Sequence, residues 1–211
     1  MIASPTRYID PTALVGAPPR YLQGAVPWEE IVRRSDAVIA LPEMIYVGPF
    51  ATIGIGARLG AGCVIDAYCR VEPFAQLGRD VLVLYRGTVG VDAVVGDRCV
   101  IGGSVSERTI IEDDCRSFGR LVHTHADSAA PWDHRDDDEP SPVIRHNSFI
   151  GHDALVIGGI EIGPRAYVCA GATVTRSVPP FHIAFGVNRL RHYQQWTGRL
   201  AANPIFQAPG P

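Results

Sequence analysis

The amino-acid sequence predicts an all-β solenoid, in which short strands stack coil upon coil, because three features recur every six residues. Read in steps of six, a column of aliphatic residues runs without interruption from Leu41 to Ile101. The residue after each aliphatic is usually glycine, as at Gly48 and Gly90. The residue four places after each aliphatic is mostly small, as at Ala51. A repeat architecture is therefore considered before any single element.

A six-residue period matches neither the 3.6 residues per turn of an α-helix nor the alternation of a lone strand. Six residues cannot bury their own apolar side chains, so each hexad is expected to form one short strand and a turn, with coils stacked about 4.8 Å apart. In a three-sided coil the aliphatic and the small residue both point inward. The glycine beside the aliphatic is expected to ease the backbone at the corner.

The N-terminal part of the chain predicts a first coil that is soon interrupted. Residues 9–16 already follow the six-residue pattern, and an insertion at about 18–40 follows them. A short helix is predicted over 27–34, because Pro27 starts it, acids occupy its first turn and arginines its last. Trp28 and Ile31 are expected to cover the open end of the solenoid.

The column of aliphatic residues then slips by four places, resumes at Ile111 and continues to His123. A polar, proline-bounded excursion is predicted at about 126–143, after which the column returns at Ile144 and holds to Val174. We expect about six coils, closed at Val178-Pro179-Pro180 because prolines cannot donate to a strand ladder.

Beyond the prolines we predict a short strand over 183–187 and a weak helix carrying Leu190, Tyr193, Trp196 and Leu200. The predicted organisation is a β-helix domain over 1–181 and a C-terminal extension over 182–211.

Composition narrows the possible functions. The 211 residues carry a net charge of −3, which gives no nucleic-acid footprint, and all 19 basic residues are arginine. The absence of lysine excludes a Schiff-base enzyme and a lysine-bearing P-loop. With no signal-peptide pattern and no membrane-spanning apolar run, we expect a soluble cytoplasmic protein. Four cysteines occupy the small inward position and are interpreted as core thiols: Cys63, Cys69, Cys99 and Cys115.

The repeat resembles the left-handed parallel β-helix of the hexapeptide-repeat acyltransferases. The resemblance implies a homotrimer with active sites between subunits and no metal. It also implies acyl transfer, most simply acetyl transfer from acetyl-CoA, to a hydroxyl or amine of a small polar acceptor such as a sugar, nucleotide sugar or natural product. No membrane or nucleic-acid partner is expected.

Two histidines where the chain leaves the coil are candidates for a general base. His125 should face outward at the mouth of the loop, where an imidazole with a pKa of about 6.5 can take a proton at neutral pH. Thr124-His125 is similar to the Thr-His of maltose and galactoside acetyltransferases, which usually follow the histidine with proline, whereas Ala126 stands here. His123, at an inward position, is the second candidate.

A carboxylate is expected to orient the imidazole. The predicted catalytic set is therefore His125, His123 and Asp127, with Asp133 and Glu139 as other acids that could do the same. An oxyanion donor is also needed, and a backbone amide can supply it.

The resemblance further implies that the pantetheine arm of CoA lies along the last coils. The corresponding residues here are small or basic, and small side chains let a thin arm approach the backbone. They are Gly158, Gly159, Ala170, Gly171, Thr175, Arg176 and Arg189. The geometry of the corners explains the glycine and alanine residues as well as contact with CoA does. The family often ends with Gly-Asn-Pro, whereas this chain has Gly186-Val187-Asn188.

Two other functions stay open. Val122-His123 and Ile150-Gly151-His152 resemble two ligand motifs of γ-class carbonic anhydrases, but Ile157 stands where the third ligand is expected. A zinc site would therefore need His123, His146 and His152 to converge across subunits, since His146 and His152 point outward on adjacent faces. A non-catalytic assembly protein is the third alternative.

Overall fold

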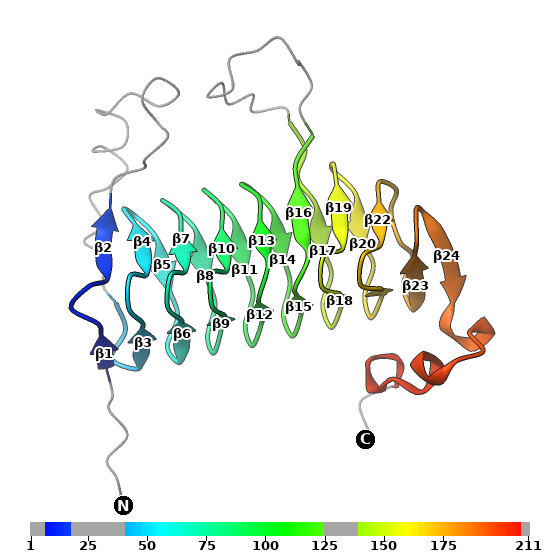
Figure 1. Cartoon of the computed structure of the whole chain (residues 1–211), viewed down its shortest axis with the longest axis horizontal. Coiled ribbons are helices and arrows are strands. Elements are labelled where there is room, and N and C mark those ends of the chain that lie inside the picture. Colours follow the sequence, from blue (N-terminus) through cyan, green and yellow to red (C-terminus); the bar gives the residue numbers. More distant parts are fainter. Residues whose placement is uncertain (1–6, 18–40, 125–138, 208–211) are drawn as a thin grey trace, which may run out of the picture.

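The computed structural model describes residues 7–17, 41–124 and 139–207. They form a left-handed parallel β-helix, as expected, with three sheets as its sides (Figure 1). The predicted helix at 27–34 lies outside the described residues. No helix among the described residues is long and apolar enough to cross a membrane.

Sheet A has ten strands. They are, in spatial order, β1 Arg7–Ile9, β3 Ile45–Val47, β6 Cys63–Ile65, β9 Leu82–Val83, β12 Val100–Ile101, β15 Arg116–Ser117, β18 Phe149–Ile150, β21 Tyr167–Val168, β23 His182–Phe185 and β24 Arg189–His192. All neighbours pair in parallel except β23 and β24, which form an antiparallel hairpin.

Sheets B and C complete the prism. Sheet B contains β2 Leu14–Ala17, β4 Thr52–Gly54, β7 Arg70–Val71, β10 Thr88–Val89, β13 Ser104–Val105, β16 Arg120–Val122, β19 Leu155–Ile157 and β22 Thr173–Val174. Sheet C contains β5 Arg58–Leu59, β8 Gln76–Leu77, β11 Val94–Val95, β14 Ile110–Ile111, β17 Val143–Ile144 and β20 Glu161–Ile162. We name the edges after the sheets they join, so that the chain turns from sheet B to sheet C at the B–C edge.

The predicted column of aliphatic residues forms the core. Val47, Ile53, Ile101 and Ile162 are each fully buried, and each stacks on its equivalent in the next coil. In two places the step between successive inward residues is four instead of six: from Ile101 to Val105 and from Ser117 to Leu121. Two coils are therefore two residues shorter at the A–B edge. Short coils keep the inward column intact because each loses residues only from a corner.

Glycine follows the aliphatic residues for a different reason from the one expected. None of Gly54, Gly90 and Gly96 has a positive φ, but a Cβ added to each would lie 2.3–2.5 Å from an atom of the next coil. The left-handed conformation falls instead on corner residues such as Asp80 (φ 56°) and Arg98 (φ 57°). Glycine is required here by the stacking distance between coils, and not by the turn.

The cysteines confirm the prediction of core thiols. Cys63, Cys69, Cys99 and Cys115 are buried with free thiols. Burial raises the pKa of Cys69 to about 11, which keeps the thiol protonated and unreactive at neutral pH.

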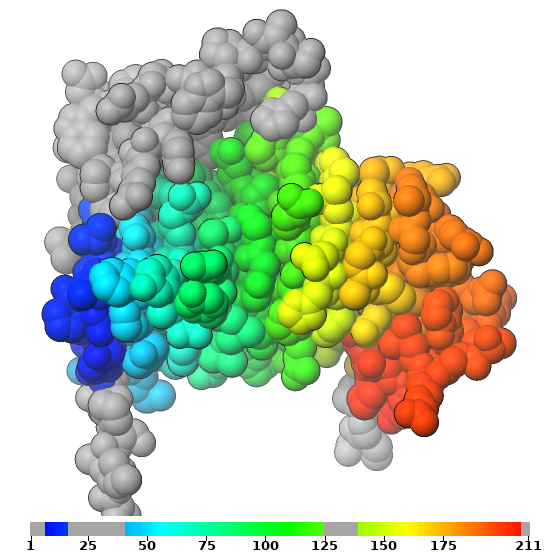
Figure 2. All heavy atoms as spheres, viewed as in Figure 1, coloured from blue at the N-terminus to red at the C-terminus, as the bar shows by residue number. Residues whose placement is uncertain are grey.

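The C-terminal end departs from the prediction in two ways. Seven coils follow the partial first one, and Pro179 and Pro180 do not close the solenoid, because β23 adds a further strand to sheet A. The prolines occupy a corner, where no ladder donor is lost. In place of the weak helix the chain forms β24 and three 3-10 helices, η1 Tyr193–Gln195, η2 Arg199–Ala202 and η3 Pro204–Phe206, packed at one end of the rod (Figure 2).

Two buried serines in the bore give a test of this packing. Ser117 stands in the aliphatic column, and its hydroxyl has no hydrogen-bond partner among the described residues, whereas the Ser148 hydroxyl donates to the Gly163 carbonyl at 2.9 Å. We predict that Ser117→Ala raises the urea unfolding midpoint, because an unsatisfied buried hydroxyl costs about 1–3 kcal/mol.

The matched variant Ser148→Ala removes a satisfied hydroxyl and should lower the unfolding midpoint. Equal destabilisation by both variants would contradict this description of the column.

Candidate active site at the B–C edge

The site is built where the chain leaves sheet B. After β16 the backbone continues through His123 and Thr124, and it returns through Glu139 and Pro140 to β17. Thr124 N–H donates to the Pro140 carbonyl at 3.2 Å, which closes the base of the excursion. His125 and Asp127 lie outside the described residues.

A histidine and a buried carboxylate meet at this base. His123 Nε2 lies 3.6 Å from Glu139 Oε2, and the two side chains are 14% and 9% exposed. The inward position of β16 belongs to the fully buried Leu121, so His123 lies just beyond the column and not within it, and it keeps an accessible fraction. A carboxylate at this distance can hold the imidazole in place and stabilise the imidazolium formed when it accepts a proton.

The next coil supports this base closely. Gly158 N–H donates to the Val122 carbonyl at 2.8 Å, and Gly158 has a φ of +89°. A Cβ on Gly159 would lie 2.3 Å from Pro140 Cβ. These two glycines, predicted as cofactor contacts, are therefore needed to let the excursion leave the coil.

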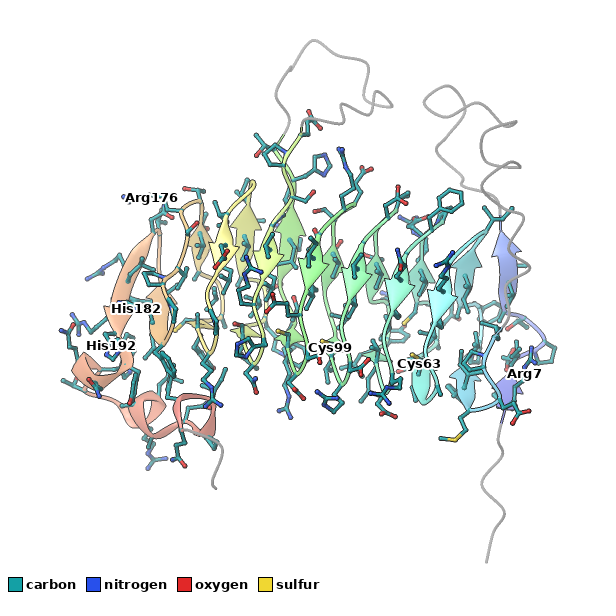
Figure 3. The ribbon with its side chains drawn as sticks, turned by 180° about the vertical axis from the view of Figure 1, so that it is seen from behind. Arg7, Cys63, Cys99, Arg176, His182 and His192 are labelled. Atoms are coloured by element: carbon teal, nitrogen blue, oxygen red, sulfur yellow. The ribbon has the colours of Figure 1, made fainter. Side chains whose placement is uncertain are left out.

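The predicted cofactor residues divide between two edges and the terminal hairpin. Thr175 and Arg176 follow β22 at the B–C edge, two coils beyond His123, or about 10 Å along the axis. Figure 3 shows Arg176 at that edge. Ala170 and Gly171 follow β21 at the A–B edge, and Arg189 lies on β24.

Local contacts distinguish these residues further. Asn188 accepts from Thr175 N–H at 2.8 Å and donates to the Thr175 hydroxyl at 2.8 Å, so both Thr175 groups are occupied. A Cβ on Gly171 would meet nothing within 4 Å, which leaves open space beside it. Arg176 is exposed.

The three histidines of the metal hypothesis do not converge within one chain. His123 lies at the B–C edge, His146 at the C–A edge after β17, and His152 at the A–B edge after β18. His152 stacks on Phe118, with ring centroids 4.7 Å apart. Among the described residues no three metal-binding side chains gather in one place.

Arg145 anchors the strand that follows the excursion. Its guanidinium donates to Glu112 and Glu161, both at 2.7 Å, and so joins three successive coils at the C–A edge. These hydrogen bonds hold the pKa of Glu112 and that of Glu161 below their usual range. No period in the sequence predicts this network, because its members come from both sides of the excursion.

Comparison with known proteins identifies the repeat. The family model described as bacterial transferase hexapeptide (six repeats) matches residues 141–176. The chain is 30% identical over 141 residues to the bifunctional protein GlmU of Rhizobium rhizogenes, and 26% identical over 153 residues to that of Streptomyces avermitilis. These alignments cover 66% and 72% of the chain but 25% and 26% of the relatives, so the chain spans about a quarter of their length.

Two solved structures match this chain at low sequence identity. AntD, an N-acyltransferase from Bacillus cereus in complex with dTDP and coenzyme A, is 14% identical over 79% of this chain and 87% of its own, with a TM-score of 0.38. Perosamine N-acetyltransferase from Caulobacter crescentus, in complex with CoA and GDP-perosamine, is 21% identical over 67% and 54%, also with a TM-score of 0.38.

The Arg145 network predicts a pH-dependent contribution to stability. Because both glutamates have lowered pKa values, their contribution is present above the unfolded pKa and is lost as the pH falls through the folded pKa. We predict that Arg145→Gln lowers the unfolding free energy at pH 7 only modestly, since the pairs are partly exposed.

Urea unfolding at neutral pH and at about pH 3 measures this, and the difference from wild type should vanish in acid. Arg116→Gln, which removes an exposed arginine without an ion pair among the described residues, is the control. A difference that persists in acid would contradict the electrostatic explanation.

Proposed function

Because the chain belongs to the hexapeptide-repeat family of bacterial transferases, we propose that it transfers an acyl group, most simply acetyl, from acyl-CoA. The acceptor is the hydroxyl or amine of a small polar molecule such as a sugar, nucleotide sugar or natural product. The observation that carries the proposal is the pairing of His123 with the buried Glu139 at the base of the excursion. A shielded imidazole with a carboxylate partner is the arrangement that general-base catalysis needs.

In this mechanism His123 takes the proton from the acceptor hydroxyl or amine. The acceptor oxygen or nitrogen attacks the thioester carbonyl, and the tetrahedral intermediate collapses by breaking the carbon–sulfur bond. The imidazolium returns the proton to the departing CoA thiolate. Glu139 stabilises the imidazolium without touching the reacting atoms, so it acts as a positioning residue.

The oxyanion needs a hydrogen-bond donor, and Gly159 is one candidate. Its N–H makes no hydrogen bond with the described residues, and the adjacent Gly158 is fixed by its bond to Val122. A backbone donor held in this way is pre-oriented before the charge develops. Asp127 and His125, the other members of the predicted catalytic set, remain proposals for the same excursion.

A homotrimer fits the division of the predicted donor-binding residues. Gly158, Gly159, Thr175 and Arg176 lie along the B–C edge, whereas Ala170 and Gly171 lie along the A–B edge of the same chain. One chain alone does not bring the two edges together. A neighbouring subunit whose A–B edge lies beside this B–C edge would complete the crevice for the pantetheine arm.

We predict that His123→Ala lowers kcat by about 10²–10⁴ while the fold is kept, as judged by circular dichroism. The measurement is thiol release from acetyl-CoA across a panel of amino sugars, nucleotide sugars and simple sugars. His125→Ala, tested beside it, decides which imidazole is the base. Full turnover in both variants would remove a histidine base from the mechanism.

We predict that Glu139→Gln lowers kcat by about 10-fold or more with little change in the KM for acetyl-CoA. The change removes the negative charge that stabilises the imidazolium, but it does not affect the binding of acetyl-CoA. The pH dependence of kcat should also shift, which loss of packing alone would not cause. Glu43→Gln, the same change at an exposed glutamate that precedes β3, is the control. An unchanged pH profile would contradict the positioning role.

A further inference from the structure

The A–B edge is set back at the level of His123. Two successive corners hold two residues each instead of four: Gly102-Gly103 between β12 and β13, and Phe118-Gly119 between β15 and β16. A Cβ added to Gly103 would collide with the Gly119 carbonyl oxygen, so backbone packs directly on backbone there. A four-residue corner returns in the next coil, where residues 151–154 join β18 to β19 (Figure 1). His152, in that corner, therefore stands at the rim of the recess.

The His152 imidazole has a defined orientation at this rim. Its ring stacks on Phe118, with centroids 4.7 Å apart and planes inclined by 26°. Gly102 leaves room for the Phe118 ring, because a Cβ there would lie 2.6 Å from Phe118 Cδ1. His152 is exposed, and its ring nitrogens make no hydrogen bond with the described residues. An imidazole always carries at least one N–H, so this corner presents a pre-oriented donor.

The imidazole also lies beside the predicted path of the acyl donor. Gly171 N–H, one coil further along the A–B edge, donates to the His152 carbonyl at 2.9 Å. Ala170 and Gly171 are both exposed, and a Cβ on Gly171 would meet nothing within 4 Å. These two residues are predicted contacts of the pantetheine arm. An arm that follows them reaches His152 after about one strand spacing, or about 4.8 Å.

Threefold symmetry would bring this corner to the catalytic base of a neighbouring subunit. Rotation about an axis parallel to the rod changes no residue's height along the rod. The corner of His152 follows the corner of His123 by two-thirds of a coil, or about 3 Å, and precedes that of Gly159 by one third, or about 1.6 Å. Where a neighbour's A–B edge lies beside this B–C edge, the neighbour's His152 therefore stands at the height of both groups.

Corner geometry alone does not require a histidine here. The second position of other four-residue corners at this edge is taken by Pro49, Ala67 and Ala170. An aliphatic side chain would also cover Phe118. A metal ion shared with His123 would lack a third imidazole, because His146 lies at the C–A edge. What remains specific to histidine is an N–H donor that faces the site across the subunit boundary.

We propose that His152 of one subunit donates a hydrogen bond to the thioester carbonyl oxygen in the active site of its neighbour. When the acceptor attacks, the carbonyl π bond opens and its electron pair becomes the oxyanion. The imidazole N–H and the Gly159 N–H donate to that oxygen without transferring a proton. The carbonyl re-forms as the carbon–sulfur bond breaks. The inference rests on the proposed acyl transfer and trimer, and adds a catalytic residue supplied from a second chain.

The first test compares two substitutions by thiol release from acetyl-CoA. His152→Ala should lower kcat by about 10²–10³ with little change in the KM for acetyl-CoA. His152→Gln keeps a side-chain N–H donor and should recover at least about 10-fold of that loss. His146→Ala, an exposed histidine at the C–A edge, is the matched control and should leave kcat unchanged. Circular dichroism verifies that each variant is folded.

Wild-type kcat in His152→Ala would overturn the inference and leave the proposed function standing. Equal losses in the alanine and glutamine variants would show a packing role on Phe118, which also overturns it. No thiol release by the wild type with any acceptor would overturn the proposed function, and the inference with it.

The second test asks which chain supplies the donor. His123→Ala and His152→Ala chains are co-expressed with different affinity tags, and oligomers that carry both tags are purified. Either mixed trimer holds one site in three with both histidines, so kcat should return to about a third of the value for doubly tagged wild type. If both histidines acted within one chain, no site would be complete and the mixture would stay inactive. An inactive mixture, or a wild type that yields no doubly tagged oligomer, overturns the inference.

Discussion

The distance between coils is the constraint on which this structure depends. Parallel strands repeat at about 4.8 Å, so every residue must fit against its equivalent one coil away. At Gly54 and Gly90 there is no room for a Cβ against the next backbone, and at Val47 and Ile53 the inward side chain must fill the bore. A stiff, regular wall results, and a flat wall is a poor place for binding and chemistry, which favour concave sites.

Function therefore has to come from departures from the repeat. The excursion after β16 is tolerated because Gly158 and Gly159 give space to its base, and because Arg145 ties the returning strand to the coils on both sides. The departure brings His123 and Glu139 together although sixteen positions separate them in sequence. The shielding of this pair gives the imidazole an environment that an open solenoid face does not offer.

The fold was predictable because the six-residue period acts at every coil. The column from Leu41 to Ile101, the core cysteines and the interruption after His123 all follow from one rule about what fits inside. The prediction of a C-terminal helix was wrong because the repeat no longer constrains this part of the chain. There the apolar spacing from Leu190 to Leu200 does not decide between helix and strand. Pairing of β24 with β23 decided the outcome there.

The site was predictable only in part. His123 could be named from its place before the excursion, and Glu139 only as one of three acids, since the path of an excursion has no period. The arrangement of Gly158 and Arg176 along one edge, with Gly171 along another, depends on how coils close and not on any motif.

A crystal structure of the chain with bound CoA is the most direct test of the proposed site. We predict that the CoA thiol lies at the B–C edge, within hydrogen-bonding reach of the His123 imidazole. A thiol bound at another edge, or a His123 ring that points away from it, would show that the reaction does not take place at this site.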